Sequence, residues 1–177
     1  MAHAVLIPSA IAAMNIDSLN RSVMSGSVAL DNGNVLLMGA EYTSGILTEV
    51  FSVTPPVAGS ATNLWMAYSG DEIVVTNAQY KGLDPDPRNF FNAAGKVFSA
   101  YKPQLGDIIV LTADAFTGSF SSNTYAGTIA YSYKLEWANA QGTGLVYKYI
   151  ATTYISLATG AIDNQRVAAY KLECVSI

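Results

Sequence analysis

Charged residues are scarce in this sequence. They make up 12% of its 177 residues, whereas apolar residues make up 51%. Soluble domains usually carry about 25% charged residues. So few charges leave little to cover a free surface, which indicates that partners cover part of it. The eleven tyrosines support this interpretation, because tyrosine is amphipathic and enriched at protein interfaces.

Clusters of positive charge are also missing. The nine lysines and arginines are scattered along the chain, and thirteen acidic residues bring the formal net charge to −4. Nucleic-acid binding depends on basic patches that neutralise phosphates. We therefore expect no nucleic-acid partner. An acidic surface of this kind would also be repelled by any densely packed DNA nearby.

Cysteine and histidine occur once each, as Cys174 and His3. A single cysteine excludes an internal disulfide framework, and the alternating segment around Cys174 indicates a small buried hydrophobe. Catalytic Ser-His-Asp and Cys-His arrangements need a histidine that its neighbours orient, which a lone residue at position three does not offer. Zinc sites draw on several His and Cys ligands. We therefore expect no enzyme activity, no metal and no cofactor.

No apolar run is long enough to span a bilayer. Residues 4–14 are apolar, but no basic region precedes them and Pro8 interrupts the run, unlike the pattern of a signal peptide. We therefore expect neither membrane association nor a cleaved leader.

What the sequence has in abundance is β-strand patterning. Segments rich in Val, Ile, Thr and Tyr alternate with turns of Gly, Asn and Asp. Asn32-Gly33 suits a tight turn, so we expect the first two strands to form a hairpin. The pattern predicts an all-β fold, a single-domain β-sandwich or partly open β-barrel over residues 21–177. The predicted strands cover residues 23–30, 35–38, 46–53, 64–68, 72–76, 108–111, 131–137, 145–157 and 166–176.

Residues 81–116 contain the clearest buried strand. Residues 108–111 read IIVL, an apolar run without interruption. Because side chains alternate between the two faces of a strand, such a run is buried on both faces. We expect this strand at the centre of the fold, with Ile109 and Leu111 in the core.

An acidic, proline-rich loop, LDPDPRNF, precedes this strand. Its two Asp-Pro steps disfavour helix. Asp84 and Asp86 are the best candidates for a cation, because oxygen ligands two residues apart can share Ca²⁺. No glycine and glutamate follow at EF-hand positions. We therefore expect a rigid structural loop in which an aspartate pairs with Arg88, and no metal site.

The segments LDPDPRNF, AGKVF and KPQLGDIIVLTADAF, together with LWMAYSG and ATTYISL, resemble small structural proteins encoded among the head and virion genes of tailed phages, including capsid decoration proteins. The similarity covers most of the chain. It implies a virion protein, and the expected function is head decoration, in which the protein binds the outer capsid surface and stabilises the lattice. The expected partners are the major capsid protein and copies of itself in a homo-oligomer. The expected locations are the capsid exterior and, during assembly, the host cytoplasm.

Two other functions stay open at this point. The chain could be a tail structural protein, or a receptor- or glycan-binding module of a head or tail fibre. In the second case Trp65, Trp137 and surface tyrosines would stack on sugar rings, whereas core packing is the simpler explanation for Trp137. An exposed groove lined by Trp and Tyr favours glycan binding, whereas a flat patch with the ordered ends of the chain against another chain favours decoration.

The first twenty residues show no sustained period. They carry several apolar side chains, but they offer no helix long enough to be stable alone. We interpret residues 1–20 as an N-terminal docking arm that reaches a neighbouring molecule. The side chains expected to make its contacts are Val5, Leu6, Ile7, Ile11, Met14 and Ile16.

Overall fold

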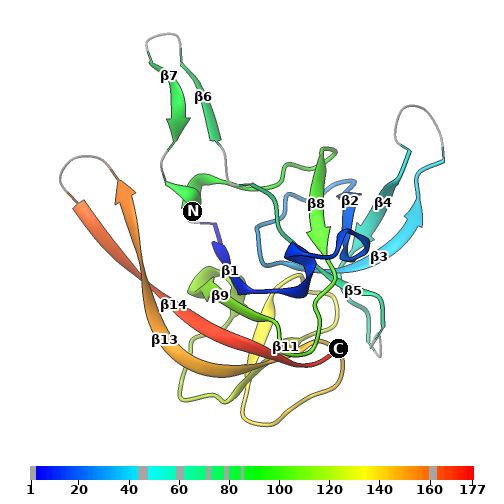
Figure 1. The fold of residues 1–177 in the computed structure, drawn as a ribbon, viewed down its shortest axis with the longest axis vertical. Helices are drawn as coiled ribbons and strands as arrows, with labels where there is room; N and C mark the ends of the chain where they lie inside the picture. The colour runs from blue at the N-terminus through cyan, green and yellow to red at the C-terminus, as the bar shows by residue number, and fades with distance from the viewer. Residues whose placement is uncertain are drawn as a thin grey trace.

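The computed structural model describes residues 3–43, 48–58, 62–70, 73–77, 80–84, 86–159 and 163–177. The prediction of an all-β fold is confirmed (Figure 1), since the only helices in these ranges are four three-residue 3-10 turns. None of them has the length or apolar character needed to cross a bilayer. The strands are β1 (Leu6–Ala10), β2 (Asn20–Met24), β3 (Val35–Glu41), β4 (Val50–Thr54), β5 (Leu64–Ala67), β6 (Ile73–Asn77), β7 (Tyr80–Asp84), β8 (Val97–Tyr101), β9 (Ile108–Thr112), β10 (Phe116–Thr117), β11 (Tyr125–Thr128), β12 (Leu135–Ala138), β13 (Val146–Thr159) and β14 (Asp163–Ser176). The 3-10 turns are η1 (Ala12–Met14), η2 (Asp17–Leu19), η3 (Pro87–Asn89) and η4 (Ala113–Ala115).

A seven-stranded sheet runs in the order β1-β9-β14-β13-β11-β12-β10. Adjacent strands in this sheet run antiparallel, except that β10 and β12 run parallel. Within it, β9 lies between β1 and β14, so that Leu111 faces Leu6 on one side and Tyr170 on the other. Ile109 and Leu111 are fully buried. The buried strand predicted at residues 108–111 is therefore confirmed.

Five further strands close into a small barrel in the order β2-β4-β3-β5-β8. Its pairs are antiparallel except for β2 and β4. Leu36, Trp65 and Phe98 pack together inside it. The remaining strands, β6 and β7, form a separate hairpin that projects from the body of the molecule (Figure 1).

One hydrophobic core joins the barrel to the sheet. Met66 and Tyr101 from the barrel belong to the same cluster as Leu111 and Tyr147 from the sheet. The hydroxyls of Tyr101 and Tyr147 lie 3.3 and 3.9 Å from the Met66 sulfur, a weak acceptor. Burial raises the pKa of both phenols. Because the barrel and the sheet share this core, they form one domain.

The hairpin predicted around Asn32-Gly33 is wrong. The turn itself is present, with Gly33 at a φ of 89° and the Asn34 N–H donating to the Asp31 carbonyl. The flanking strands do not pair with each other, however: β2 pairs with β4 and β8, and β3 pairs with β4 and β5. Gly33 instead lies against Leu111, where a side chain would collide. The glycine thus permits a close approach between barrel and sheet.

The strand predicted over residues 131–137 begins only at Leu135. Tyr131 has a left-handed φ of 64°, which a strand does not accommodate, so the alternation of residues before Leu135 reflects a turn. Residues 46, 47 and 72 of two other predicted strands lie outside the described ranges. The remaining predictions at residues 46–53, 64–68, 72–76, 145–157 and 166–176 correspond to β4, β5, β6, β13 and β14 with shifted ends.

Residues 3–20 contribute to the domain's own core. β1 pairs with β9 at the edge of the sheet, and Val5, Leu6 and Ile11 are only 4%, 3% and 6% exposed. The prediction of these three as docking residues is corrected here. They face inward because β9 offers an apolar neighbour, which a segment without a clear period did not reveal. The three other predicted docking residues are exposed, namely Ile7, Met14 and Ile16.

Replacing Ile109 tests the position of β9. Ile109→Ala should lower the free energy of unfolding by about 2–5 kcal/mol, because it removes buried surface and leaves a cavity. Val110→Ala is the matched control on the same strand, where the side chain is half-buried, and should cost about 1 kcal/mol. Urea denaturation followed by circular dichroism measures both. An Ile109→Ala protein as stable as the wild type would contradict the buried position.

Deleting residues 1–11 tests the place of the N-terminal segment. The deletion removes β1 and exposes one edge of β9 together with its apolar neighbours. We expect the truncated protein to lose its cooperative thermal transition and to bind a hydrophobic dye such as ANS. Leu6→Ala should have a milder effect, about 2–5 kcal/mol. A truncated protein that melts cooperatively at the wild-type midpoint would instead identify the segment as a free arm.

Candidate docking surfaces

A buried carboxylate organises one end of the molecule. Asp107, directly before β9, is 4% exposed, and its oxygens accept N–H hydrogen bonds from Ala12 at 2.9 Å and Gln104 at 2.8 Å. The Cys174 N–H donates to the Asp107 carbonyl at 2.8 Å, and the Gly106 N–H donates to the Cys174 carbonyl at 2.9 Å. A buried charge requires such donors. Here they connect η1, the loop before β9 and the end of β14.

Cys174 is buried beside this carboxylate. Burial and, secondarily, the charge of Asp107 raise the pKa of the Cys174 thiol to about 12. The thiol therefore stays protonated near neutral pH, where a protonated thiol is a poor nucleophile. The prediction that Cys174 is a small buried hydrophobe is confirmed.

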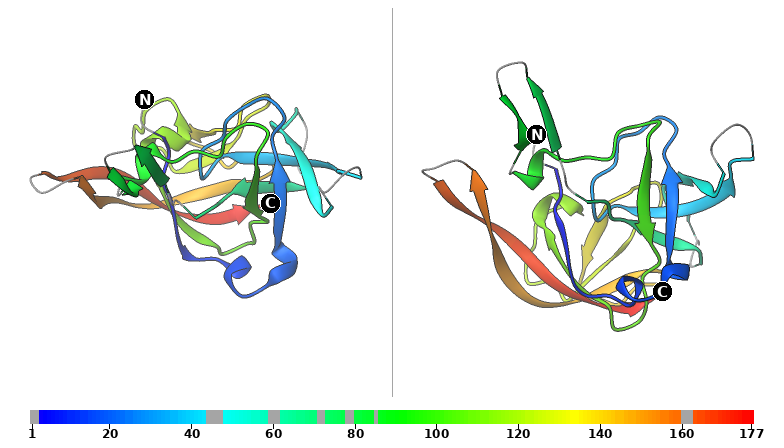
Figure 2. Two further views of the ribbon diagram at one scale, coloured as in Figure 1. Left: turned by 90° about the horizontal axis from the view of Figure 1, so that it is seen from above. Right: turned by 45° about the horizontal axis from the view of Figure 1, so that its top comes forward.

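Exposed apolar side chains surround this end. Met14 is 59% exposed, Ile16 45%, Leu105 63% and Ile177 48%. Ile177 also lines a small groove with Pro103. In both views of Figure 2 the segment with η1 and η2, in blue, lies near the C-terminus. We refer to these four exposed side chains as the apolar end. The buried carboxylate holds the backbone close to Met14 and Leu105.

His3 holds the start of the chain in place. Its Nδ1 lies 2.7 Å from one oxygen of Asp31, whose other oxygen accepts the Ala4 N–H at 3.1 Å. The imidazole ring packs on Phe91 with the ring centroids 4.9 Å apart. The backbone N–H of His3 donates to the Arg88 carbonyl at 2.8 Å. These contacts give His3 and Asp31 a structural role.

The predicted Asp–Arg pair is present before β8. Asp86 is the N-cap of η3 and accepts the Arg88 backbone N–H at 3.0 Å, while Nη2 of Arg88 lies 2.8 Å from Oδ2. Hydrogen bonding to the guanidinium lowers the pKa of Asp86 and raises that of Arg88. The side chain of Asp84 lies outside the described part of the chain. Within that part no three potential metal ligands gather.

Trp65 and Trp137 are both packed against neighbours. Trp65 is buried in the barrel, and its Nε1–H donates to Oδ1 of Asn63 at 3.1 Å. Trp137 stacks on Phe116 with ring centroids 4.3 Å apart, and Phe120 meets it at a steep angle at 5.0 Å. Trp65 is thus unable to stack on a sugar. For Trp137, packing against these aromatic rings accounts for the position of its side chain.

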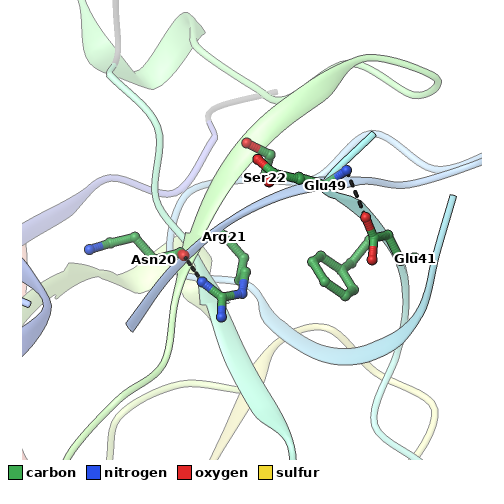
Figure 3. A pocket seen from close by; sticks show the side chains of 6 residues that line it. Asn20, Arg21, Ser22, Glu41 and Glu49 are labelled. Atoms are coloured by element: carbon green, nitrogen blue, oxygen red, sulfur yellow. Dashed lines mark hydrogen bonds between the residues drawn. The ribbon is translucent and has the colours of Figure 1, made fainter. Parts of the chain in front are cut away.

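An open groove of about 410 Å³ lies beside the barrel (Figure 3). Arg21 on β2, Glu41 on β3 and Phe51 on β4 contribute to its lining. The Glu49 N–H donates to Oε1 of Glu41 at 2.8 Å, and Glu49 has a left-handed φ of 62°. The charged side chains are exposed, so the groove offers both signs of charge and one aromatic ring to a small polar molecule.

The β13–β14 hairpin extends beyond the sheet (Figure 1). The two strands pair with each other along nearly their whole length, but β13 pairs with β11 only through residues 146–148 and β14 pairs with β9 only through residues 169–173. Among the described residues, no further strand flanks residues 150–159 or 163–168. We call these two segments the distal ribbon.

Uncharged side chains cover the β13 half of the distal ribbon. Tyr154 is 61% exposed and Ile150 is 44% exposed. Residues 149–159 read YIATTYISLAT, without a charge or a proline. A register shift between Tyr149 and Ala151 marks a bulge where the strand leaves the sheet. Because isolated two-stranded hairpins are marginally stable in water, the distal ribbon is suited to binding another strand.

Comparisons with protein-family models, with curated proteins and with solved structures found no match. Sequence reasoning missed the role of Asp107, because its hydrogen-bond partners lie far along the chain. It also missed the groove, whose residues come from three strands and from the loop before β4 and share no motif.

Asp86→Asn should lower the free energy of unfolding at neutral pH by about 1 kcal/mol, because a charge-assisted hydrogen bond is weakened. The folded-state pKa of Asp86 is depressed, so its carboxylate contributes stability above its unfolded pKa of about 4 and loses that contribution as pH falls through the folded pKa. The gap between wild type and variant should therefore narrow in acid. Urea titrations at neutral and acidic pH measure it, with exposed Asp17→Asn as control. A gap independent of pH would exclude the charge as its cause.

Proposed function

We propose that this chain is a non-enzymatic structural protein of a tailed-phage virion, acting as a head decoration protein on the outer capsid surface. The apolar end carries the proposal. Met14 and Leu105 are more than half exposed, on loops that a buried carboxylate holds in place. Apolar side chains on preorganised loops lose little entropy on binding, which suits a docking contact. The resemblance to phage virion proteins and the scarcity of charge support the same role.

The partner in this function is the major capsid protein in its assembled lattice. A protein that binds the assembled lattice and not the free subunit stabilises the lattice by mass action. The net charge of −4 disfavours contact with packaged DNA and favours the capsid exterior. Before assembly the protein resides in the host cytoplasm. The function needs no cofactor, membrane or nucleic acid.

A receptor- or glycan-binding module is a second candidate, and the groove beside Arg21 favours it. Phe51 supplies an aromatic ring there, and Asn20, Ser22 and Glu41 supply polar groups. A few convergent polar groups beside an apolar surface are typical of small-molecule sites. The apolar end has no part in this alternative.

Met14→Glu combined with Leu105→Glu should abolish binding to heads assembled without this protein. Burying two unpaired carboxylates at the contact costs several kcal/mol, so the affinity should fall by at least about 100-fold. Cosedimentation of the purified protein with heads measures it. Val28→Glu is the matched control, since Val28 is an exposed valine outside the apolar end, and it should bind like the wild type.

Three outcomes of this experiment would change the proposal. Unchanged head binding by the double variant would remove the apolar end from the docking surface. Binding to purified tails and not to heads would assign the protein to the tail. Binding to host glycans that Arg21→Ala abolishes, without binding to heads, would favour the glycan-binding module.

A further inference from the structure

We propose that the distal ribbon is a self-association site, at which the free edge of β13 pairs antiparallel with the same edge of a second copy of this chain. The inference deepens the proposed function, because it assigns the surface through which copies pair. It rests on that function only for the place where the pairs form, the virion surface.

The free edge of β13 specifies a strand as its partner. One edge of residues 150–159 is paired with β14, and the other faces no strand among the described residues. Ala151, Thr152 and Tyr154 are exposed along this segment. Unpaired N–H and C=O groups on an exposed strand edge bind another extended backbone. The chemistry of the edge therefore selects a β-strand and not a helix or a flat apolar surface.

Nothing in the β13 sequence protects this edge. Natural sheets usually protect exposed edges with charges, proline or bulges, but residues 149–159 contain no charge and no proline. The bulge at Ile150 lies at the root of the ribbon and not along it. β1, at one edge of the same sheet, carries Pro8, which lacks an N–H to donate. The contrast between a blocked edge and an open one marks the β13 edge as an interface.

A second copy of the chain fits this edge. A twofold axis across the edge brings two identical uncharged segments into antiparallel contact, so no like charges meet. With the axis near Thr153, that residue opposes its own copy, Thr152 opposes Tyr154, and Ala151 opposes Ile155. Pairs of β-branched and aromatic side chains of this kind stabilise antiparallel strands. A charged partner would find no complementary charge on the β13 edge.

The pairing is large enough to hold two copies together. With the axis at Thr153, the antiparallel contact covers residues 150–156, because residues 146–148 are paired with β11. It forms about seven backbone hydrogen bonds, within the usual range of about 10 ± 5 for a specific interface. It also joins two marginal two-stranded ribbons into one four-stranded sheet, which is independently more stable. Exposed Ile150 and Tyr154 then gain neighbours on the second copy.

Opposite charges at one position test the pairing in the full-length protein. Thr153→Lys and Thr153→Glu each place like charges beside the axis, and each should weaken the wild-type dimer at least about tenfold. Mixed in equal amounts, the two variants should form a heterodimer, because lysine then faces glutamate. Analytical ultracentrifugation measures the fraction of dimer in each variant alone and in the mixture. Val28→Lys, at an exposed site away from the ribbon, should dimerise like the wild type, and circular dichroism checks that each monomer is folded.

A cysteine at the axis gives an independent measurement. Thr153→Cys should form an intermolecular disulfide on mild oxidation, since residues opposed across a strand pair have Cβ atoms about 4.5–5.5 Å apart. The buried native thiol, with its pKa of about 12, does not compete. Absence of any cross-linked dimer from Thr152→Cys, Thr153→Cys and Tyr154→Cys alike would overturn the pairing.

Each remaining outcome also decides the question. A wild-type protein that stays monomeric at about 0.5 mM, or a dimer unaffected by both charge variants, overturns self-pairing through this edge. A monomeric wild type whose Thr153→Lys variant loses head binding assigns the edge to a capsid strand and likewise overturns it. Head binding is scored separately. Failed pairing with intact head binding leaves the decoration function standing, and pairing without head binding supports the self-association site alone.

Discussion

The pairing of β9 with β1 on one side and β14 on the other is the interaction on which the rest of the structure depends. It brings the start and the end of the chain to one strand. Leu111 on β9 is also the side chain that Gly33 approaches, so the barrel reaches the sheet there. Asp107, directly before β9, fixes the loops that present the apolar end. A single buried strand therefore sets the positions of the core, the termini and one candidate docking surface.

Sequence reasoning located β9 because four consecutive apolar residues indicate burial whatever their neighbours are. It also located the Asp86–Arg88 pair, because the two residues lie within one turn. It missed the pairing of β3, since Asn32-Gly33 indicates a turn but not which strands meet. It misassigned Leu6 for the same reason, because the partner of β1 lies about a hundred residues away and only the packed fold identifies it.

The apolar end and the distal ribbon lie at opposite ends of β14. This strand runs for fourteen residues, and at about 3.3 Å per residue it spans up to about 45 Å. Its last residues lie beside Asp107, whereas its first residues belong to the distal ribbon (Figure 1). In the proposed function, contact with a capsid through the apolar end would leave the free edge of β13 open. One molecule therefore has room for both proposed contacts, which would let it connect neighbouring lattice positions.

An open, uncharged strand edge carries a risk of aggregation, because strands can add to it without limit. The proposed twofold pairing would remove this risk, since an isologous contact uses the same edge on both copies and closes after one addition. On a capsid, the proposed site of action, the pairing would not need to be strong by itself. Copies docked side by side have a high effective concentration, which makes a modest edge contact sufficient to bridge them. Docking would supply the position and edge pairing the cross-link, so each contact would stabilise the lattice more in the presence of the other.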